Sequence, residues 1–260
     1  MPYASLRCEV VDSVATIALD APGTRNALSD AVLDDLLAAF ADARDDAGVR
    51  CVVLASTHER VFSAGGDLAG FTADVPLVDR HAANDRFPRL FELIGRLGKP
   101  VVCAVGGHAL GGAVGLALAC DLVVASEAAT FGTPEIGVGL FPFMIAALVA
   151  RNVPRKPMSQ LLLLGEPIDA HEAHRIGVVN RVVAPDALDA AVDEWAQALA
   201  GRSPLLLRLG KDALYAQQDM GFVEALAHGR AQLSLALSSD DAREGAAAFL
   251  ERREPRWTGS

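Results

Sequence analysis

The sequence is poor in aromatic residues and has no excess of positive charge. The lack of positive charge limits which partners the chain can bind. Aromatic residues make up 5% of its 260 residues, and 23 basic side chains stand against 33 acidic ones, for a formal charge of -10. A broad nucleic-acid surface needs clustered Lys and Arg to displace counterions, so we expect no nucleic-acid partner. The apolar content of 52% is high enough for a folded core rather than a disordered chain.

The chain also lacks a C-x-x-C pair and an N-terminal secretory pattern. Its four cysteines are Cys8, Cys51, Cys103 and Cys120, and three of them lie in or beside apolar runs, where a thiol packs as a small hydrophobe. The uncharged stretch 100–120 is 21 residues long, enough to span a bilayer, but five glycines, a proline and a histidine divide it. We therefore expect a reduced cytoplasmic protein with no membrane partner.

Three common enzyme signatures are missing as well. No G-x-G-x-x-G fingerprint of dinucleotide-binding proteins occurs. Ser63 lies in FSAGG rather than in the G-x-S-x-G elbow of serine hydrolases. His171 and His174 are three residues apart, but no acidic or cysteine partner at a suitable spacing completes a zinc site. We expect no bound metal.

Apolar strands alternate with helices in the first half of the chain. Short apolar runs without polar alternation are typical of strands that are covered on both faces. From the predicted N-cap Ser29, apolar residues recur at helical spacing as far as Phe40. Strands separated by helices predict an α/β core with a largely parallel sheet, or a sheet coiled into a superhelix. The predicted strands are residues 14–19, 51–55, 101–105 and 122–125.

After about Pro134 the pattern becomes helical, with one more strand expected at 178–183. Asp186 is predicted to cap the first of four C-terminal helices. Residues 1–198 are therefore predicted to form the core and residues 199–260 a helical lobe that packs on the core or on a neighbouring subunit. The predicted helices are residues 186–200, 204–218, 222–237 and 240–252.

Two segments share one design, in which small residues follow an apolar strand and lead into a helix. They are FSAGGDL at 62–68 and GGHALGG at 106–112. Glycines at such a junction let the backbone approach a ligand closely, and the N-terminus of a helix offers N–H groups without a helical acceptor. The two segments could bring two N–H donors to one oxyanion, although tight packing alone would also explain the glycines.

These two segments, followed by FGTPEIGVGL at 131–140, resemble the crotonase, or enoyl-CoA hydratase/isomerase, superfamily in order and spacing. The resemblance continues through 163–170 and 177–183 to AFLERR at 248–253, so it covers nearly the whole chain. It implies a crotonase-like spiral of ββα turns with a C-terminal helical lobe, assembled as trimers that usually pair into hexamers. It also implies an acyl-CoA thioester as substrate, with coenzyme A as part of that substrate and no separate cofactor.

The resemblance implies which residues act. The backbone N–H groups of Gly66 and Gly112 would form an oxyanion hole for a thioester enolate, whose charge such donors stabilise. Hydratases of the family carry two glutamates, of which the first falls on Gly115 and the second on Glu135. Adding water needs two carboxylates, whereas moving a double bond needs one base that shuttles a proton. The single glutamate favours isomerase-type chemistry over hydration.

The resemblance also implies how coenzyme A binds. Arg25, Ala64 and Leu68 would lie near the nucleotide, and a neighbouring subunit would supply Phe249 and Arg252. For either arginine, an ordinary surface charge is the alternative.

The segment FPFMI at 141–145 replaces a glycine-rich loop of the family, so Phe143 and its neighbours should reshape the acyl pocket. Because Gly115 lacks a carboxylate, two other interpretations stay open. One is a different CoA-thioester reaction, such as decarboxylation or hydrolysis, and the other is a non-catalytic acyl-CoA-binding pseudoenzyme.

Overall fold

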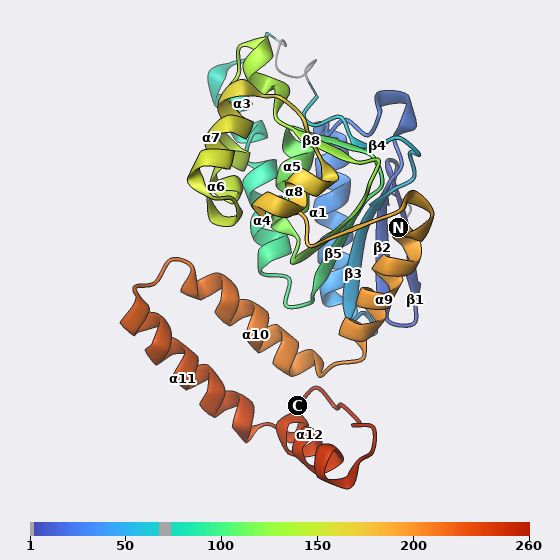
Figure 1. Ribbon diagram of the computed structural model, residues 1–260, viewed down its shortest axis with the longest axis vertical. Helices are drawn as coiled ribbons and strands as arrows, with labels where there is room; N and C mark the ends of the chain where they lie inside the picture. The colour runs from blue at the N-terminus through green and yellow to red at the C-terminus, as the bar shows by residue number, and fades with distance from the viewer. Residues whose placement is uncertain (1–2, 68–73) are drawn as a thin grey trace.

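The computed structural model describes residues 3–67 and 74–260 and contains a six-stranded main sheet (Figure 1). Its strand order is β1-β2-β3-β5-β7-β10, with β1 antiparallel to β2 and the other neighbours parallel. The predicted, largely parallel sheet is therefore confirmed. The strands are β1 (Leu6–Val11), β2 (Val14–Leu19), β3 (Cys51–Ser56), β5 (Val101–Val105), β7 (Leu122–Ser126) and β10 (Arg181–Val183).

Helices cover both faces of this sheet, which explains why its strands lack polar alternation. In β3, Val52 and Leu54 face the larger core, which includes α1 (Asp30–Asp45), whereas Cys51 and Val53 face α9 (Leu188–Ala200). The Ser29 side chain accepts a hydrogen bond from Val32 N–H, as predicted for the N-cap of α1.

A second, four-stranded sheet places the predicted site segments together. Its order is β4-β6-β8-β9, and β4, β6 and β8 run parallel, whereas β9 is antiparallel to β8. The segments that follow the three parallel strands therefore leave the sheet at one edge. The strands are β4 (Val61–Ser63), β6 (His108–Leu110), β8 (Thr130–Gly132) and β9 (Ile168–Asp169).

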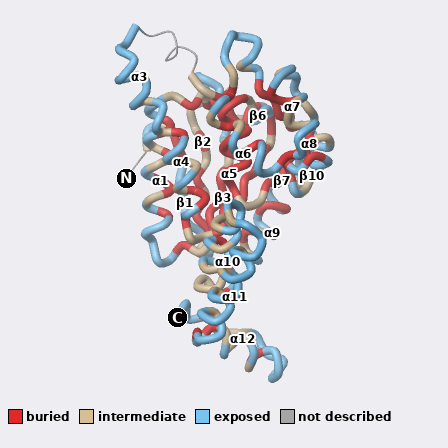
Figure 2. Tube along the Cα trace, turned by 90° about the vertical axis from the view of Figure 1, so that its left-hand side faces the viewer, coloured by how far each residue is buried: buried red, intermediate tan, exposed pale blue. Residues whose placement is uncertain are grey.

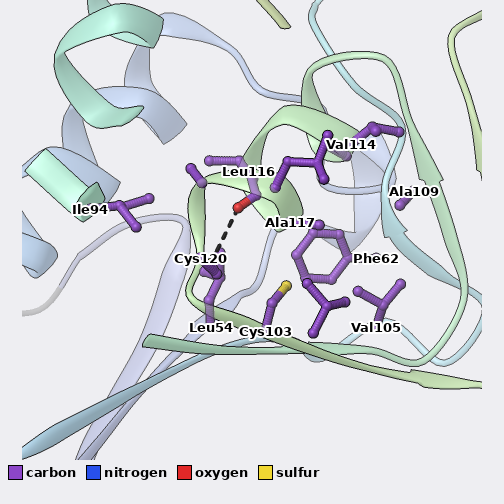
Figure 3. Close-up of a cluster of buried hydrophobic side chains, with 14 of the residues drawn as sticks. Leu54, Phe62, Ile94, Cys103, Val105, Ala109, Val114, Leu116, Ala117 and Cys120 are labelled. Carbon is purple, nitrogen blue, oxygen red and sulfur yellow. Dashed lines mark hydrogen bonds between the residues drawn. The ribbon is translucent and has the colours of Figure 1, made fainter. Parts of the chain in front are cut away.

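Helix α5 (Gly112–Ala119) is buried at every residue. Its own residues are small or apolar on all sides, so none of its faces needs contact with water. Figure 3 shows the core at this helix, in which Cys103 and Cys120 lie among Leu54, Phe62 and Leu116. The Cys120 thiol donates to the Leu116 carbonyl oxygen at 3.2 Å. The remaining core helices are α3 (Leu77–Ala83), α4 (Arg86–Gly95), α6 (Phe143–Asn152), α7 (Arg155–Leu164) and α8 (Ala170–Ile176).

Three C-terminal helices, α10 (Pro204–Gln217), α11 (Phe222–Ser238) and α12 (Asp240–Glu251), lie apart from the two sheets (Figure 1). Helix α10 is fastened to the core by Lys211, whose Nζ donates to Asp121 Oδ2 at 2.6 Å and to the Lys99 carbonyl oxygen at 3.0 Å. Figure 2 shows the buried residues concentrated in the core, whereas α11 has no buried residue.

The structure corrects two of the predicted elements, and five strands, β1, β4, β6, β8 and β9, were not predicted. Asp186 does not cap α9; it lies in a 3-10 turn (Pro185–Ala187) that precedes the helix. The predicted strand at 178–183 shortens to Arg181–Val183, because the N–H groups of Val178 and Val179 bond to the Ala173 carbonyl oxygen at the end of α8 instead of joining the sheet.

The uncharged stretch 100–120 forms β5, β6 and α5, as its glycines indicate. Across residues 3–67 and 74–260, none of the helices combines the length and hydropathy that a bilayer-spanning segment requires.

Candidate active site

A cavity of about 950 Å³ opens at the edge of the second sheet where β4, β6 and β8 end. Each of these strands contributes the segment that follows it to the cavity wall: Ala64, Gly65 and Gly66 after β4, Gly111 and Gly112 after β6, and Pro134 and Glu135 after β8. Ligands bind at the carboxyl ends of parallel strands in many α/β proteins for the same topological reason. The structure therefore brings both predicted glycine segments and the predicted glutamate to one cavity.

The two glycine segments touch each other directly. Gly65 has a φ of +88° and lies so close to the Leu110 carbonyl that a side chain there would overlap with it. A Cβ built on Gly65 would also lie 3.5 Å from Gly111 Cα. Glycine is needed at this crossing because the backbone is left-handed and no side chain fits.

The segment of Gly66 is also tied to the start of α1. Leu28 N–H donates to the Gly65 carbonyl oxygen at 2.8 Å, and Leu28 and Gly66 form an isolated parallel bridge.

Gly112 is the first residue of α5 and is buried. The N–H groups of the first helical turn have no helical acceptor, and they lie at the positive end of the helix dipole. Gly111, which precedes it, donates its own N–H to the Gly132 carbonyl oxygen at 2.8 Å. This hydrogen bond joins the segment that follows β6 to the end of β8. The start of α5 is thus held at the cavity wall by the neighbouring strand.

Glu135 lies against the start of α5. A Cβ built on Gly111 would lie 3.0 Å from Glu135 Cδ and would overlap with Oε1, so the carboxylate packs directly on this glycine. Among the described residues, no group hydrogen-bonds the buried Oε2. Burial raises the pKa of the Glu135 carboxyl, and a hydrogen bond from its own backbone N–H opposes this in part. When ionised, a carboxyl group with a raised pKa is a stronger base than an ordinary glutamate, which suits it to accept and return a proton.

Gly115 is the position at which hydration would be expected to need a second carboxylate, and it has no free space beside it. A Cβ built there would lie 2.5 Å from Ile145 Cγ2 and 2.8 Å from Phe91 Cζ. Helices α6 and α4 therefore fill this position with apolar side chains.

The predicted binding residues lie in different parts of the molecule. Ala64 N–H donates to the Arg25 carbonyl oxygen at 3.0 Å, so these two residues are neighbours, and the Arg25 side chain is exposed. Phe143 lines the cavity, and its ring centroid lies 4.9 Å from that of Phe141. Leu68 lies outside the described residues.

Phe249 and Arg252 do not reach the cavity of their own chain. They lie at the end of α12, at the opposite end of the molecule from α3, which lines the cavity (Figure 1). The Phe249 side chain is 83% exposed.

Several cavity and support residues escaped the sequence analysis. Helices α3 and α4 contribute polar and apolar side chains to the wall, for which the amphipathic spacing of Phe87, Leu90, Phe91 and Ile94 was an available signal. Asn26 and Ser63, both fully buried, lie behind the glycine segment that follows β4. The missed wall residues are Arg80, His81, Asn84, Asp85 and Phe87.

The family model for enoyl-CoA hydratase/isomerase matches residues 9–260. The chain belongs to this family. It is 35% identical over 247 residues to the 2,3-dehydroadipyl-CoA hydratase of Escherichia coli, covering 95% of each chain. It is also 32% identical over 255 residues to the crotonyl-CoA hydratase of Syntrophomonas wolfei, covering 98% of each.

Solved structures of this family have the same fold. The enoyl-CoA hydratase of Mycobacterium smegmatis superposes with a TM-score of 0.93 at 33% identity, covering 97% of this chain and 98% of that one. The crotonase fold predicted from the sequence is confirmed, and the chain is an enzyme of the enoyl-CoA hydratase family, for which acyl-CoA substrates are implied.

Proposed function

We propose that this enzyme isomerises an enoyl-CoA by moving a proton through Glu135, while the N–H groups of Gly66 and Gly112 hold the thioester oxygen. The observation that carries the proposal is the contact of the Glu135 carboxylate with Gly111. At the Gly115 position, by contrast, the side chains of Ile145 and Phe91 leave no space for a second carboxylate. One carboxylate then lies at the start of α5, in reach of a substrate whose carbonyl oxygen binds there.

The reaction balances with Glu135 alone. Its carboxylate takes a proton from the α-carbon of a 3-enoyl-CoA, and the electron pair of that C–H bond delocalises into the thioester carbonyl and the neighbouring double bond. The carbonyl oxygen then carries the charge, which two backbone N–H donors stabilise. Glu135 returns the proton to the γ-carbon, the double bond moves between the α- and β-carbons, and a 2-enoyl-CoA leaves.

The apolar half of the cavity wall suits the acyl group. A volume of about 950 Å³ lies at the upper end of the range of roughly 300–1,000 Å³ for small-molecule sites. The side chains that line this part are contributed by α4, by α6, by the 3-10 turn Pro134–Val138 and by the segment between that turn and α6. They are Phe87, Val138, Leu140, Phe141, Phe143, Met144 and Ile145.

Hydration is the second candidate, because relatives that are 32–35% identical bear the names of hydratases. A hydratase here would need a group other than Gly115 to assist Glu135. The described titratable side chains that line the cavity besides Glu135 are Arg80, His81 and Asp85, all from α3 or the residue before α4.

A substrate panel tests the two candidates. The purified protein is incubated with 2-enoyl-, 3-enoyl- and β-keto acyl-CoAs, and the products are followed by mass spectrometry. The proposal predicts that 3-enoyl-CoA and 2-enoyl-CoA interconvert without a change in mass. Chromatography separates these two isomers. A gain of one water from 2-enoyl-CoA without any isomerisation would refute it.

We further propose that the enzyme forms a homotrimer or hexamer in which α12 of one subunit completes the coenzyme A site of the next. Support comes from the apolar residues that α11 and α12 expose: Phe222 and Leu226 of α11 are 79% and 59% exposed, and Phe249 of α12 is 83% exposed. Phe249 and Arg252, together with Arg25, Ala64 and Leu68, are proposed to bind coenzyme A. The boundary between a core of 1–198 and a lobe of 199–260 stays a prediction, as does a cytoplasmic location.

Complementation between subunits tests this arrangement. Glu135→Gln and Arg252→Ala are each expected to be impaired. If Arg252 acts on the neighbouring subunit, co-assembling the two variants regenerates some intact sites, and activity rises above that of either variant. Activity equal to the mean of the two variants would show that Arg252 does not act across subunits.

A further inference from the structure

We propose that Asn26 and Ser63 are positioning residues that fix the backbone donor at Gly66. This inference rests on the proposed function, because it assumes that the Gly66 N–H binds the thioester oxygen. It is drawn from a buried network of hydrogen bonds that joins the segment after β4 to the loop before α1.

Asn26 is the centre of this network. It is 0% exposed, and its backbone is left-handed with a φ of +55°. Its Oδ1 accepts the Ala21 N–H at 2.8 Å, while its Nδ2 donates to Ser56 Oγ at 2.8 Å and to the Phe62 carbonyl oxygen at 3.2 Å. The side-chain amide therefore bridges the loop that follows β2, the end of β3, and β4.

Ser63 connects Asn26 to Gly65 through hydrogen bonds. Its hydroxyl donates to the Asn26 carbonyl oxygen at 2.6 Å and accepts the Gly65 N–H at 3.1 Å. Ser63 is 0% exposed, so water does not replace either contact. Leu28 N–H holds the Gly65 carbonyl oxygen from the other side at 2.8 Å. Both polar groups of Gly65 are thereby occupied, and the next N–H in the chain is that of Gly66.

The network matters for catalysis because an oxyanion donor acts only at the correct distance. Removing such a donor costs about 10²–10³ in rate, and a misplacement of about 1 Å can cost about 10². Gly65 and Gly66 carry no side chains that could anchor them by packing. The hydrogen bonds of Ser63 and Asn26 supply the anchor that packing cannot.

The chain offers a matched control for Ser63. Ser126, at the end of β7, is 1% exposed. Its hydroxyl accepts the N–H of Ala128 at 3.1 Å, the same contact to the second following residue that Ser63 makes with Gly65. Ser126 does not line the cavity. Replacing either serine by alanine removes the hydrogen bond of a buried hydroxyl, so both variants should lose stability.

The experiment compares Ser63→Ala, Ser63→Thr and Ser126→Ala for kcat and KM on a 3-enoyl-CoA and for melting temperature. It also measures the Kd for an S-alkyl-CoA thioether, which lacks the carbonyl oxygen. We expect Ser63→Ala to lose about 10- to 10²-fold in kcat while its thioether Kd stays within twofold of wild type. Ser63→Thr keeps the hydroxyl and should recover most of the kcat, and Ser126→Ala should keep wild-type kcat despite its lower melting temperature.

Wild-type kcat in Ser63→Ala, or an equal loss in Ser126→Ala, overturns the inference, and so does an equal loss in kcat and thioether affinity. If Ser63→Ala does not fold, Ser56→Ala replaces it, because this change removes the hydrogen bond from Asn26 Nδ2 to Ser56 Oγ and leaves Ser63 intact. A reduced kcat in Ser56→Ala at unchanged thioether Kd supports the inference, and an unchanged kcat overturns it.

Glu135→Gln, measured in parallel, separates the two claims. If it keeps wild-type turnover, the proposed function fails. If it is inactive while Ser63→Ala is fully active, only the positioning role fails.

Discussion

The Glu135 carboxylate lies directly on the backbone of Gly111, the residue that precedes the first turn of α5. Gly111 has a φ of +53°, which glycine adopts without strain. Its missing side chain leaves the space that Oε1 occupies. One residue, Gly111, therefore places both the proposed proton-transfer group and the start of the proposed oxyanion hole.

Gly111→Ala should both strain the backbone and displace the Glu135 carboxylate. We expect a loss of about 1–3 kcal/mol in stability and a fall of about 10²-fold in kcat. Gly98→Ala is the control, because Gly98 also has a positive φ of +72° but contacts only the Arg208 side chain. It should lower the melting temperature and leave kcat unchanged. Equal effects of the two variants on kcat would show that Gly111 does not position Glu135.

Glu135→Gln should stabilise the protein at neutral pH. Burial raises the pKa of Glu135 in the folded state above the value of about 4.3 in an unfolded chain. The stability linked to its proton is therefore fully present below about pH 4 and is lost as the pH rises through the folded-state pKa. Gln has no such loss. Melting curves should show the variant above wild type at pH 7, with the difference vanishing near pH 4; a difference that does not vary with pH would contradict the raised pKa.

Two double variants isolate the Gly112 donor from the bulk of the new side chain. A Cβ at Gly112 would lie 2.9 Å from Phe87 Cε1, so each variant carries Phe87→Leu to make room. Proline is tolerated at the first position of a helix but has no N–H. Gly112→Pro should therefore have a kcat about 10²–10³ below that of Gly112→Ala, with circular dichroism confirming both folds. Equal kcat values would remove Gly112 from the oxyanion hole.

Gly115→Glu alone should be poorly tolerated, because Ile145 and Phe91 occupy the space that the side chain needs. Overpacking of this kind costs about 1–3 kcal/mol, and the buried carboxylate adds to the loss. Combining it with Ile145→Ala opens that space. We expect the double variant to raise the ratio of hydrated to isomerised product, measured by chromatography and mass spectrometry, relative to Ile145→Ala. An unchanged ratio would show that a carboxylate at this position does not activate water.

Local sequence patterns were enough to predict the strands of the main sheet other than β1 and the start of α1, but not β4, β6 and β8, whose ends carry the site. The strand at 14–19, the strand at 101–105 and the cap at Ser29 occur as predicted, because apolar runs and capping residues act over a few positions. The two glycine segments were predicted from the design they share, and Glu135 from the resemblance to the crotonase superfamily. The structure adds the reason why they meet, which is that β4, β6 and β8 are parallel neighbours.

Features that depend on long-range contacts could not be predicted in this way. Nothing near Gly115 in the sequence indicates that Ile145 and Phe91 fill the space beside it. Nothing in the sequence marks Asn26 or Ser63 as buried, and only the fold shows that they are 0% exposed and bonded to each other. The distance of Phe249 from the cavity likewise follows from how α10 to α12 leave the core (Figure 1).

Solvent deuterium incorporation at the α- and γ-carbons of a 3-enoyl-CoA tests the central claim most directly, when wild type and Glu135→Gln are compared by mass spectrometry. If Glu135 carries the proton between the two carbons, wild type exchanges deuterium at both positions. Glu135→Gln should keep its affinity for the ligand and lose about 10²–10⁴-fold in exchange rate. Equal exchange in the two proteins would mean that another residue is the base and would contradict the account.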